Sequence, residues 1–152
     1  MDPERYIQSY RVTLPENHPH RAVRWMAQSW GDSPQMADEL GGLIVSGTKT
    51  ATCSAFWEYE FEEQALPRAG LLTVVLDGRG LPLCVIENVE VMVRRFCEVD
   101  AAFAWEEGEG DRSLGYWREE HRGFFTRNLA SIGRVFNEDV PLVCERFRMV
   151  FP

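Results

Sequence analysis

The chain has 152 residues, 45% of them hydrophobic, and a formal net charge of −8 at pH 7. This length and apolar content predict one folded domain with a hydrophobic core. The acidic balance argues against a protein that coats duplex DNA, since such binding rests on many Lys and Arg contacts to phosphate, but it allows a nucleoside or a single-stranded RNA. No apolar run approaches the roughly 20 residues of a membrane span and no secretory signal is recognisable, so we expect a cytoplasmic protein without a membrane partner.

The cysteines do not form a metal-binding pattern. Cys53, Cys84, Cys97 and Cys144 show no Cys-x-x-Cys spacing and no pairing with a histidine. Buried thiols are therefore predicted, with no metal. The sequence also has no glycine-rich phosphate loop and no His-Glu-x-x-His motif, so no cofactor is expected.

The first predicted elements are helices. Apolar side chains at near-helical spacing over residues 21–30 predict a helical arm, residues 1–29, packed on a domain that occupies residues 30–152. The next helix is predicted to start at Ser33, which is a favourable cap followed by proline, and to end at Gly47.

Strands are predicted next. Residues 50–57, 71–76 and 83–93 are rich in β-branched and other apolar side chains, and an Asp-Gly-Arg-Gly sequence joins the last two as a hairpin. Glu87 interrupts the apolar face of the third strand. A carboxylate on a buried face is either paired or functional.

The C-terminal part alternates helices with a final strand. Helices are predicted over residues 99–105 and 114–129, separated by an acidic, glycine-broken loop, and a strand over residues 142–151. His121 lies on the apolar stripe of the second helix, and we interpret it as a packing residue because no metal partner shares its spacing. The element order predicts an α+β fold: a small, mostly antiparallel β-barrel with flanking helices.

Lys49 is the only lysine beside fifteen arginines. Arginine keeps its proton in proteins, whereas the pKa of a buried lysine shifts readily, so lysine can serve as a general base. The alternative is a solvated turn residue.

A set of short motifs resembles the ASCH domain family over about residues 30–152. The motifs are Trp30-Gly31-Asp32-Ser33-Pro34, Gly47-x-Lys49-x-x-Thr52, Trp57-Glu58-Tyr59-Glu60, Glu107-Gly108-Glu109-Gly110-Asp111-Arg112-Ser113-Leu114 and Val143-Cys144-Glu145-Arg146-Phe147. The resemblance implies a PUA-like barrel with a cleft and a link to RNA or its modified nucleosides. Members of the family include an amidohydrolase that deacetylates acetylated cytidine, and a ribonuclease.

The resemblance also implies a catalytic set. The Lys, Thr and Glu of the amidohydrolase match Lys49, Thr52 and Glu107, which would act as general base, nucleophile and acid. In a regular strand residues 49 and 52 face opposite sides, so this scheme needs a kink or bulge at the strand entry. If the strand is straight, Thr50 or Ser54 is the alternative partner of the lysine. Taken alone, Thr52 is an ordinary strand threonine and Glu107 a solvated loop residue.

Other side chains are candidates for substrate contact, namely Asp32, Ser54, Trp57, Glu58 and Glu87. Trp57 can stack on a base and Glu58 can accept hydrogen bonds from exocyclic or ribose donors. The alternative role of Asp32 is to fix the turn before its helix.

Three functions are compatible with these residues: an amidohydrolase for an acylated nucleoside, a ribonuclease for single-stranded RNA, or a noncatalytic RNA-binding module. In the ribonuclease, Lys49 would stabilise phosphate charge while Glu107 or Glu87 acts on the ribose hydroxyl.

Overall fold

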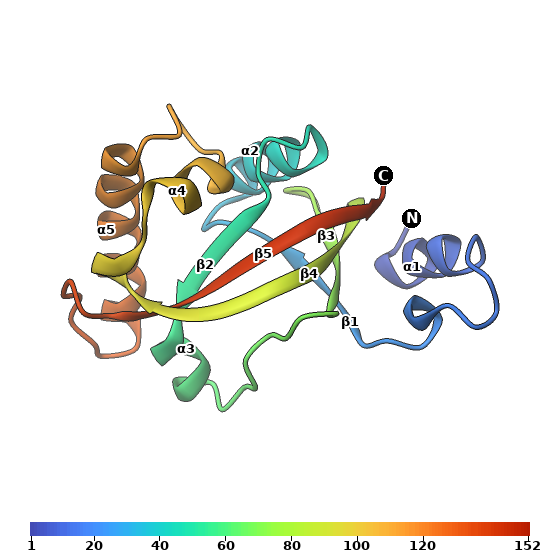
Figure 1. Ribbon diagram of the computed structural model, residues 1–152, viewed down its shortest axis with the longest axis horizontal. Coiled ribbons are helices and arrows are strands. Elements are labelled where there is room, and N and C mark those ends of the chain that lie inside the picture. The colour runs from blue at the N-terminus through green and yellow to red at the C-terminus, as the bar shows by residue number, and fades with distance from the viewer. The chain divides into compact units, whose positions relative to one another are not determined.

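A computed structural model describes all 152 residues (Figure 1). The chain forms two compact units. The first comprises Met1–Thr48, Arg68–Val89 and Phe147–Pro152, and the second comprises Lys49–Pro67 and Glu90–Arg146. None of the helices has the length and apolar composition that a membrane span requires.

The strands pair in the order β1-β3-β4-β5-β2. β1 (Trp25–Ser29) runs parallel to β3 (Leu72–Leu76), and β3 is antiparallel to β4 (Pro82–Arg95). β2 (Ala51–Ala55) is antiparallel to β5 (Pro141–Phe151). The predicted α+β class, with a mostly antiparallel sheet and flanking helices, is confirmed.

The helix predicted over residues 21–30 is wrong. The N-terminal segment instead forms helix α1 (Pro3–Arg11), the short 3-10 helix η1 (Pro19–Arg21) and strand β1. In β1 the register runs from Trp25 opposite Leu72 to Ser29 opposite Leu76. The pairing with β3 provides hydrogen-bond partners for this backbone, and such tertiary pairing readily overrides a local helical pattern.

The strand predicted over residues 50–57 is too long, because β2 ends at Ala55. The chain then turns into α3 (Phe56–Phe61). Glu58 stands in the first turn of this helix, where a negative charge is favourable. Trp57 packs against the core of the second unit from this helix.

The predicted helix from Ser33 to Gly47 is confirmed as α2 (Pro34–Val45) in the first unit. The Ser33 hydroxyl accepts a hydrogen bond from the Met36 amide at 3.1 Å. Gly47 has φ +81°, a left-handed conformation that favours glycine after a helix. Ile44 anchors α2 in a cluster with Val75, Cys84, Ile86 and Phe147.

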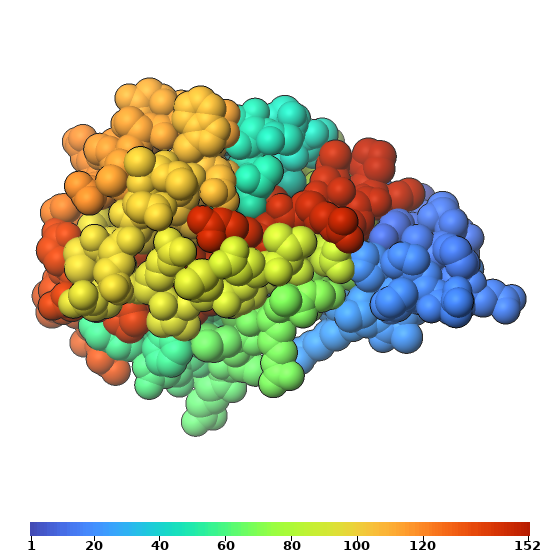
Figure 2. All heavy atoms as spheres, viewed as in Figure 1, coloured from blue at the N-terminus to red at the C-terminus, as the bar shows by residue number.

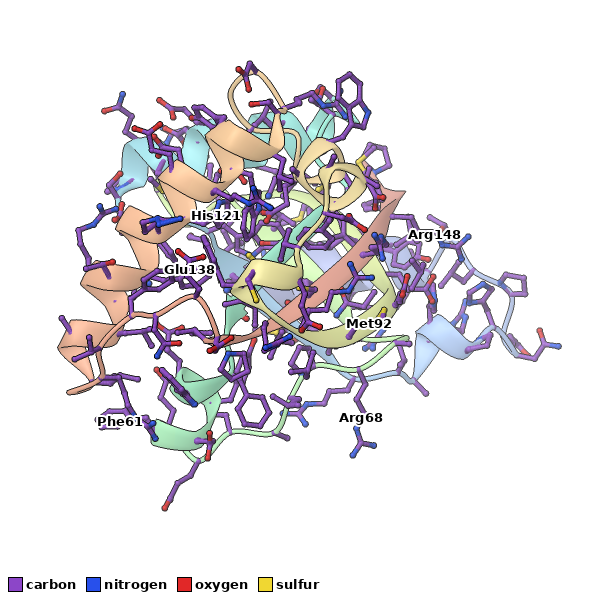
Figure 3. All side chains as sticks on the ribbon, turned by 60° about the vertical axis from the view of Figure 1, so that its left-hand side comes forward. Phe61, Arg68, Met92, His121, Glu138 and Arg148 are labelled. Atoms are coloured by element: carbon purple, nitrogen blue, oxygen red, sulfur yellow. The ribbon has the colours of Figure 1, made fainter.

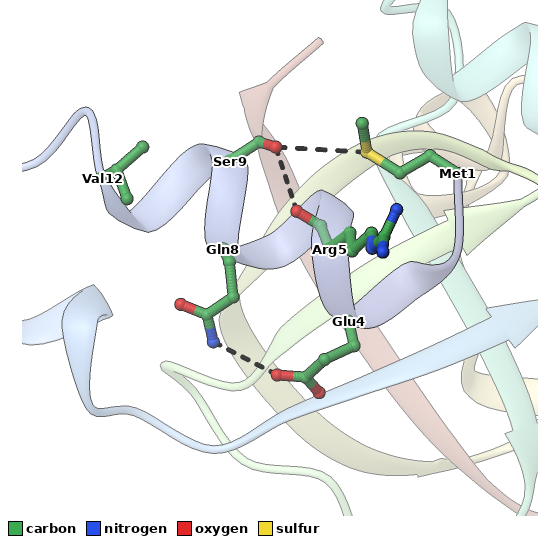
Figure 4. A pocket seen from close by; sticks show the side chains of 6 residues that line it. All are labelled: Met1, Glu4, Arg5, Gln8, Ser9 and Val12. Atoms are coloured by element: carbon green, nitrogen blue, oxygen red, sulfur yellow. Dashed lines mark hydrogen bonds between the residues drawn. The ribbon is translucent and has the colours of Figure 1, made fainter.

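Helix α1 packs on the same unit through Ile7 and Tyr10, which are buried against Leu72, Val74 and Val85. Figure 2 shows the N-terminal segment, in blue, beside the red C-terminal end of the chain. The rings of Tyr6 and Phe151 lie 5.4 Å apart there. The outer face of α1 has a shallow depression lined by residues of its own helix and by Met1 (Figure 4).

Glu87 is paired within the first unit. Its carboxylate lies 2.7 Å from His20 Nε2 and 2.8 Å from Arg148 Nη2, and His20 Nδ1 is 2.7 Å from the Tyr10 hydroxyl. Burial would raise the pKa of Glu87, but the hydrogen bonds and charges of His20 and Arg148 lower it below its ordinary value. Of the two alternatives for this residue, the structure shows the paired one.

The second unit has its own core. It contains β2, α3, the 3-10 helix η2 (Phe96–Glu98), α4 (Ala101–Glu107) and α5 (Leu114–Ser131). Large apolar side chains buried in this core, which come mainly from α4 and α5, are Phe96, Phe103, Trp117, Phe125 and Leu129.

We predict that Gly78→Ala destabilises the fold. A Cβ at Gly78 would lie 2.3 Å from the backbone oxygen of Pro34, and neither backbone can yield easily. Overpacking of this kind costs about 1–3 kcal/mol in the free energy of unfolding, which urea denaturation measures. Gly42→Ala is the matched control, since a Cβ there meets nothing within 4 Å and alanine favours a helix by up to about 1 kcal/mol. Equal stability of the two variants would contradict this packing.

Candidate functional site

Lys49 opens the second unit, between Gly47 and the first residue of β2. Its side chain is only 1% exposed. The neighbouring Thr50 amide donates a 2.7 Å hydrogen bond to the backbone oxygen of Glu106, which ties the start of the strand to the last turn of α4. The lysine is therefore a buried residue and not a solvated turn residue.

The ammonium of Lys49 is surrounded by oxygen acceptors. Nζ lies 3.0 Å from Glu107 Oε1, 3.3 Å from the Glu107 backbone oxygen and 2.8 Å from Glu109 Oε2. An ammonium has three N–H donors, so these contacts match its full capacity. Glu107 is the last residue of α4, and Gly108, at φ +73°, ends the helix before Glu109.

The second oxygen of Glu107 is bound just as closely. Trp117 Nε1 donates a short hydrogen bond to Glu107 Oε2, and both Cys53 Sγ and His121 Nε2 lie 3.3 Å from the same atom. Trp117 and His121 stand one turn apart on α5, with their rings stacked at 4.2 Å. His121 is labelled in Figure 3, where it projects from α5.

The surroundings of His121 favour the protonated form of its ring. Its Nδ1 lies 2.8 Å from the backbone oxygen of Trp117, and its Nε2 faces the carboxylate of Glu107. A carbonyl and a carboxylate are acceptors only, so both ring nitrogens must donate. Burial would lower the pKa of His121, but the charge and hydrogen bond of Glu107 raise it above its ordinary value.

Four ionisable side chains meet at the site, namely Lys49, His121, Glu107 and Glu109. Burial would lower the pKa of Lys49, yet the charges of Glu107 and Glu109 outweigh it and raise the pKa. Burial would raise the pKa of Glu107, yet Lys49 and His121, with the Trp117 hydrogen bond, hold it well below its usual range. The Lys49 ammonium and the protonated ring of His121 thus face two carboxylates, and this pairing reduces the free-energy cost of burying ions.

The raised pKa of Lys49 conflicts with its expected role as a general base. A lysine base needs a depressed pKa, which desolvation alone would provide. The two carboxylates reverse that shift, so Lys49 is an ammonium ion in the resting site.

Thr52 occupies a regular strand. β2 pairs with β5 without a bulge, from Ala51 opposite Arg146 to Ala55 opposite Leu142. Cys53 Sγ contacts Glu107, so the alternation of a strand directs the Thr52 side chain to the other face of β2. The regular pairing places no bulge between Ala51 and Ala55, and Lys49 lies before the first paired residue of the strand.

The other candidate residues lie in several places. Ser54 hydrogen bonds to the Tyr59 hydroxyl at 2.9 Å, and the Trp57 ring stacks under the guanidinium of Arg134 at 4.6 Å. Burial, reinforced by Glu62, raises the pKa of Glu58 above its ordinary value. Asp32 and Glu87 belong to the first unit.

Four residues that contact Lys49 or Glu107 were not among the site residues predicted from the sequence: Cys53, Glu109, Trp117 and His121. Two signals point to some of them. Cys53 is four residues after Lys49, which in a strand places both side chains on the same face. Trp117 and His121 are one turn apart on a predicted helix. No local pattern predicts that Glu109 reaches Lys49.

Comparison with known proteins identifies the family. An ASCH domain model matches residues 26–151. The chain belongs to the ASCH domain family. The resemblance noted in the sequence is thereby confirmed, and with it a PUA-like fold, which is an RNA-binding fold.

Solved structures support this placement. The ASCH domain from Lactobacillus crispatus JV V101 is 32% identical with a TM-score of 0.93, over 98% of this chain and 94% of that one. Protein EF3133 from Enterococcus faecalis V583 is 36% identical with a TM-score of 0.79, over 97% and 85% of the two chains. The hypothetical protein PH0355, at 14% identity and a TM-score of 0.54, shares the fold alone. Comparison with the curated proteins gives no match.

We predict that the ASCH domain loses stability when one member of the ion pair is removed. Lys49→Met leaves Glu107 buried without its main cation, which costs about 3 kcal/mol or more in the free energy of unfolding. Adding Glu107→Gln removes the stranded charge, so urea denaturation of the double variant should show a smaller loss than the sum of the single variants. Arg122→Gln, at a pair with Glu138 that is 48% and 53% exposed, should change stability by less than about 1 kcal/mol. Strict additivity at the buried pair would refute the coupling.

Proposed function

We propose that this ASCH domain is an amidohydrolase that acts on a small acylated nucleoside of the acetylated-cytidine kind. The observation that supports it is the Lys49–Glu107 ion pair, with a 3.0 Å separation and side chains that are 1% and 2% exposed. These are the positions that match the lysine and glutamate of the family's amidohydrolase. Strongly perturbed, buried ionisable groups of this kind are enriched at functional sites.

The pair contains both a base and an acid. Transfer of one proton from Lys49 Nζ to Glu107 Oε1 along their hydrogen bond converts two ions into a neutral amine and a carboxylic acid. Amide hydrolysis needs a base to take the proton of the nucleophile and an acid to protonate the leaving nitrogen. Water still reaches Glu109, whose side chain is 26% exposed, so a substrate that covers it favours the neutral pair, because desolvation penalises charged forms.

Glu109 is the displaceable partner of Lys49. Its side chain is 26% exposed, whereas that of Glu107 is 2% exposed. The acyl oxygen of a substrate can take the place of Glu109 Oε2 on the ammonium, where the charge stabilises the developing oxyanion. Departure of Glu109 also removes one of the charges that raise the pKa of Lys49, which brings the lysine closer to acting as a base.

The nucleophile in this proposal is a water molecule. Thr52, which the sequence resemblance assigns to this role, faces away from the side of β2 on which Cys53 meets Glu107. A water activated by the Lys49–Glu107 pair needs no change in the strand.

The acidic charge of −8 also favours a nucleoside over a long RNA. Few phosphate contacts are needed for a nucleoside-sized amide, so its hydrolysis should depend little on salt, whereas RNA binding weakens steeply as salt rises.

Our prediction for Lys49→Arg is a loss of at least about 100-fold in kcat/KM on acetylated cytidine or a close analogue. Arginine keeps the positive charge but cannot become a neutral base. Chromatographic assay of the released acid and nucleoside measures the rate, and Arg118→Lys on α5, the reverse exchange at an exposed position, is the control with full activity expected.

The same preparations should be assayed with labelled single-stranded RNA at low and high salt. Cleavage of RNA that depends on Lys49, without hydrolysis of any acylated nucleoside, would replace the proposal with a ribonuclease. Tight RNA binding without either reaction would replace it with a binding module.

For Thr52→Ala we expect a kcat/KM within about tenfold of the wild type, since a water nucleophile survives the change. A missing nucleophile typically costs several orders of magnitude. A loss of 100-fold or more in a variant with an unchanged circular dichroism spectrum would assign the attack to Thr52 and show that β2 rearranges around the substrate.

A further inference from the structure

A second property of the network follows from the three side chains that converge on one point in the second unit. Cys53 comes from β2, Glu107 from the end of α4 and His121 from α5. Their ligand atoms, Sγ, a carboxylate oxygen and a ring nitrogen, all lie within 4.8 Å of one another. We propose that these residues form a binding site for a thiolate-preferring divalent cation, with Zn²⁺ as the expected metal. The inference goes beyond the proposed hydrolysis and does not depend on it.

The separations fit one tetrahedral ion. With Zn–O and Zn–N bonds of about 2.0 Å, the oxygen and nitrogen ligands of a tetrahedron are about 3.3 Å apart, and a Zn–S bond of about 2.3 Å places sulfur about 3.5 Å from the oxygen. Glu107 Oε2 lies 3.3 Å from His121 Nε2 and 3.3 Å from Cys53 Sγ. To bind the ion, Cys53 Sγ and His121 Nε2 need only approach each other to a similar distance. The three protein ligands leave a fourth position for water.

The surroundings orient two of the ligands. Metal-bound histidines usually donate their second ring N–H to a backbone carbonyl or a carboxylate, which fixes the ring. His121 does so through Nδ1, which lies 2.8 Å from the Trp117 backbone oxygen, so that Nε2 is turned to the site. Trp117 Nε1 holds Glu107 Oε2, and Lys49 holds Oε1.

Charge is conserved when the ion binds. Zn²⁺ replaces the thiol proton of Cys53 and one proton of the His121 ring, and both protons pass to the solvent. The doubly charged ion thus takes the place of two protons, and Lys49 and Glu109 remain balanced as before. A sulfur, nitrogen and oxygen set of this kind suits Zn²⁺ or Co²⁺, whereas Mg²⁺ and Ca²⁺ prefer oxygen ligands alone.

Cobalt provides the direct test. The full chain, treated with a chelator and a thiol-free reductant, is titrated with Co²⁺ while the near-ultraviolet charge-transfer band of a cobalt thiolate is followed. We expect one equivalent to produce the band and Zn²⁺ to abolish it by displacement. Cys53→Ser and His121→Gln should each weaken binding by at least about 100-fold, since loss of an outer-shell partner alone costs 10–100-fold.

Cys97→Ser is the matched control, because Cys97 is the exposed cysteine and contributes nothing to the site. It should bind Co²⁺ as the wild type does. A wild type without the band, a band that persists in Cys53→Ser, or a band lost in Cys97→Ser would each overturn the site. Circular dichroism of the variants separates loss of a ligand from loss of the fold, and the absorption readout is independent of any hydrolytic activity.

Discussion

The burial of the Lys49–Glu107 ion pair is the constraint on which the rest of the second unit depends. Moving two ions out of water costs several kcal/mol each, and mutual attraction offsets this only when the remaining donors and acceptors are also satisfied. Each neighbouring element meets part of that need. The end of α4 supplies Glu107, the loop after Gly108 supplies Glu109, and α5 supplies Trp117 and His121.

The same constraint determines how Lys49 can react. A lone buried lysine would lose its proton, but a lysine between two carboxylates keeps it. The reactivity of Lys49 therefore depends on its partners. A substrate that displaces Glu109, or that shields the ion pair from water, lowers the pKa of the lysine. The solitary lysine in the sequence identified the position, and the structure shows the two carboxylates that raise its pKa and so favour the ammonium form.

The sequence predicted well those elements whose signals are local. α2, with its Ser33 cap and Gly47 stop, and the hairpin between β3 and β4 follow from residues adjacent in the chain. β1 could not be predicted, because its strand conformation comes from pairing with β3, more than forty positions away. The same limit applies to the site: Lys49 and Glu107 came from spaced motifs, whereas Glu109 and the donors from α5 reach the pair only through the tertiary fold.

Glu87 and Glu107, two carboxylates that the sequence marked for different reasons, illustrate why geometry is needed to assign function. Glu87 and Glu107 each bind a histidine, and each has a second cationic partner. The second partner of Glu87 is Arg148, which is 66% exposed and always charged, so that network can hold Tyr10 and His20 of the N-terminal segment in place but cannot exchange a proton through its cation. The second partner of Glu107 is a 1% exposed lysine, whose proton can move. Proton transfer from the second cationic partner is therefore available to Glu107 and unavailable between Glu87 and Arg148, and this difference supports the choice of the Lys49 network for the proposed chemistry.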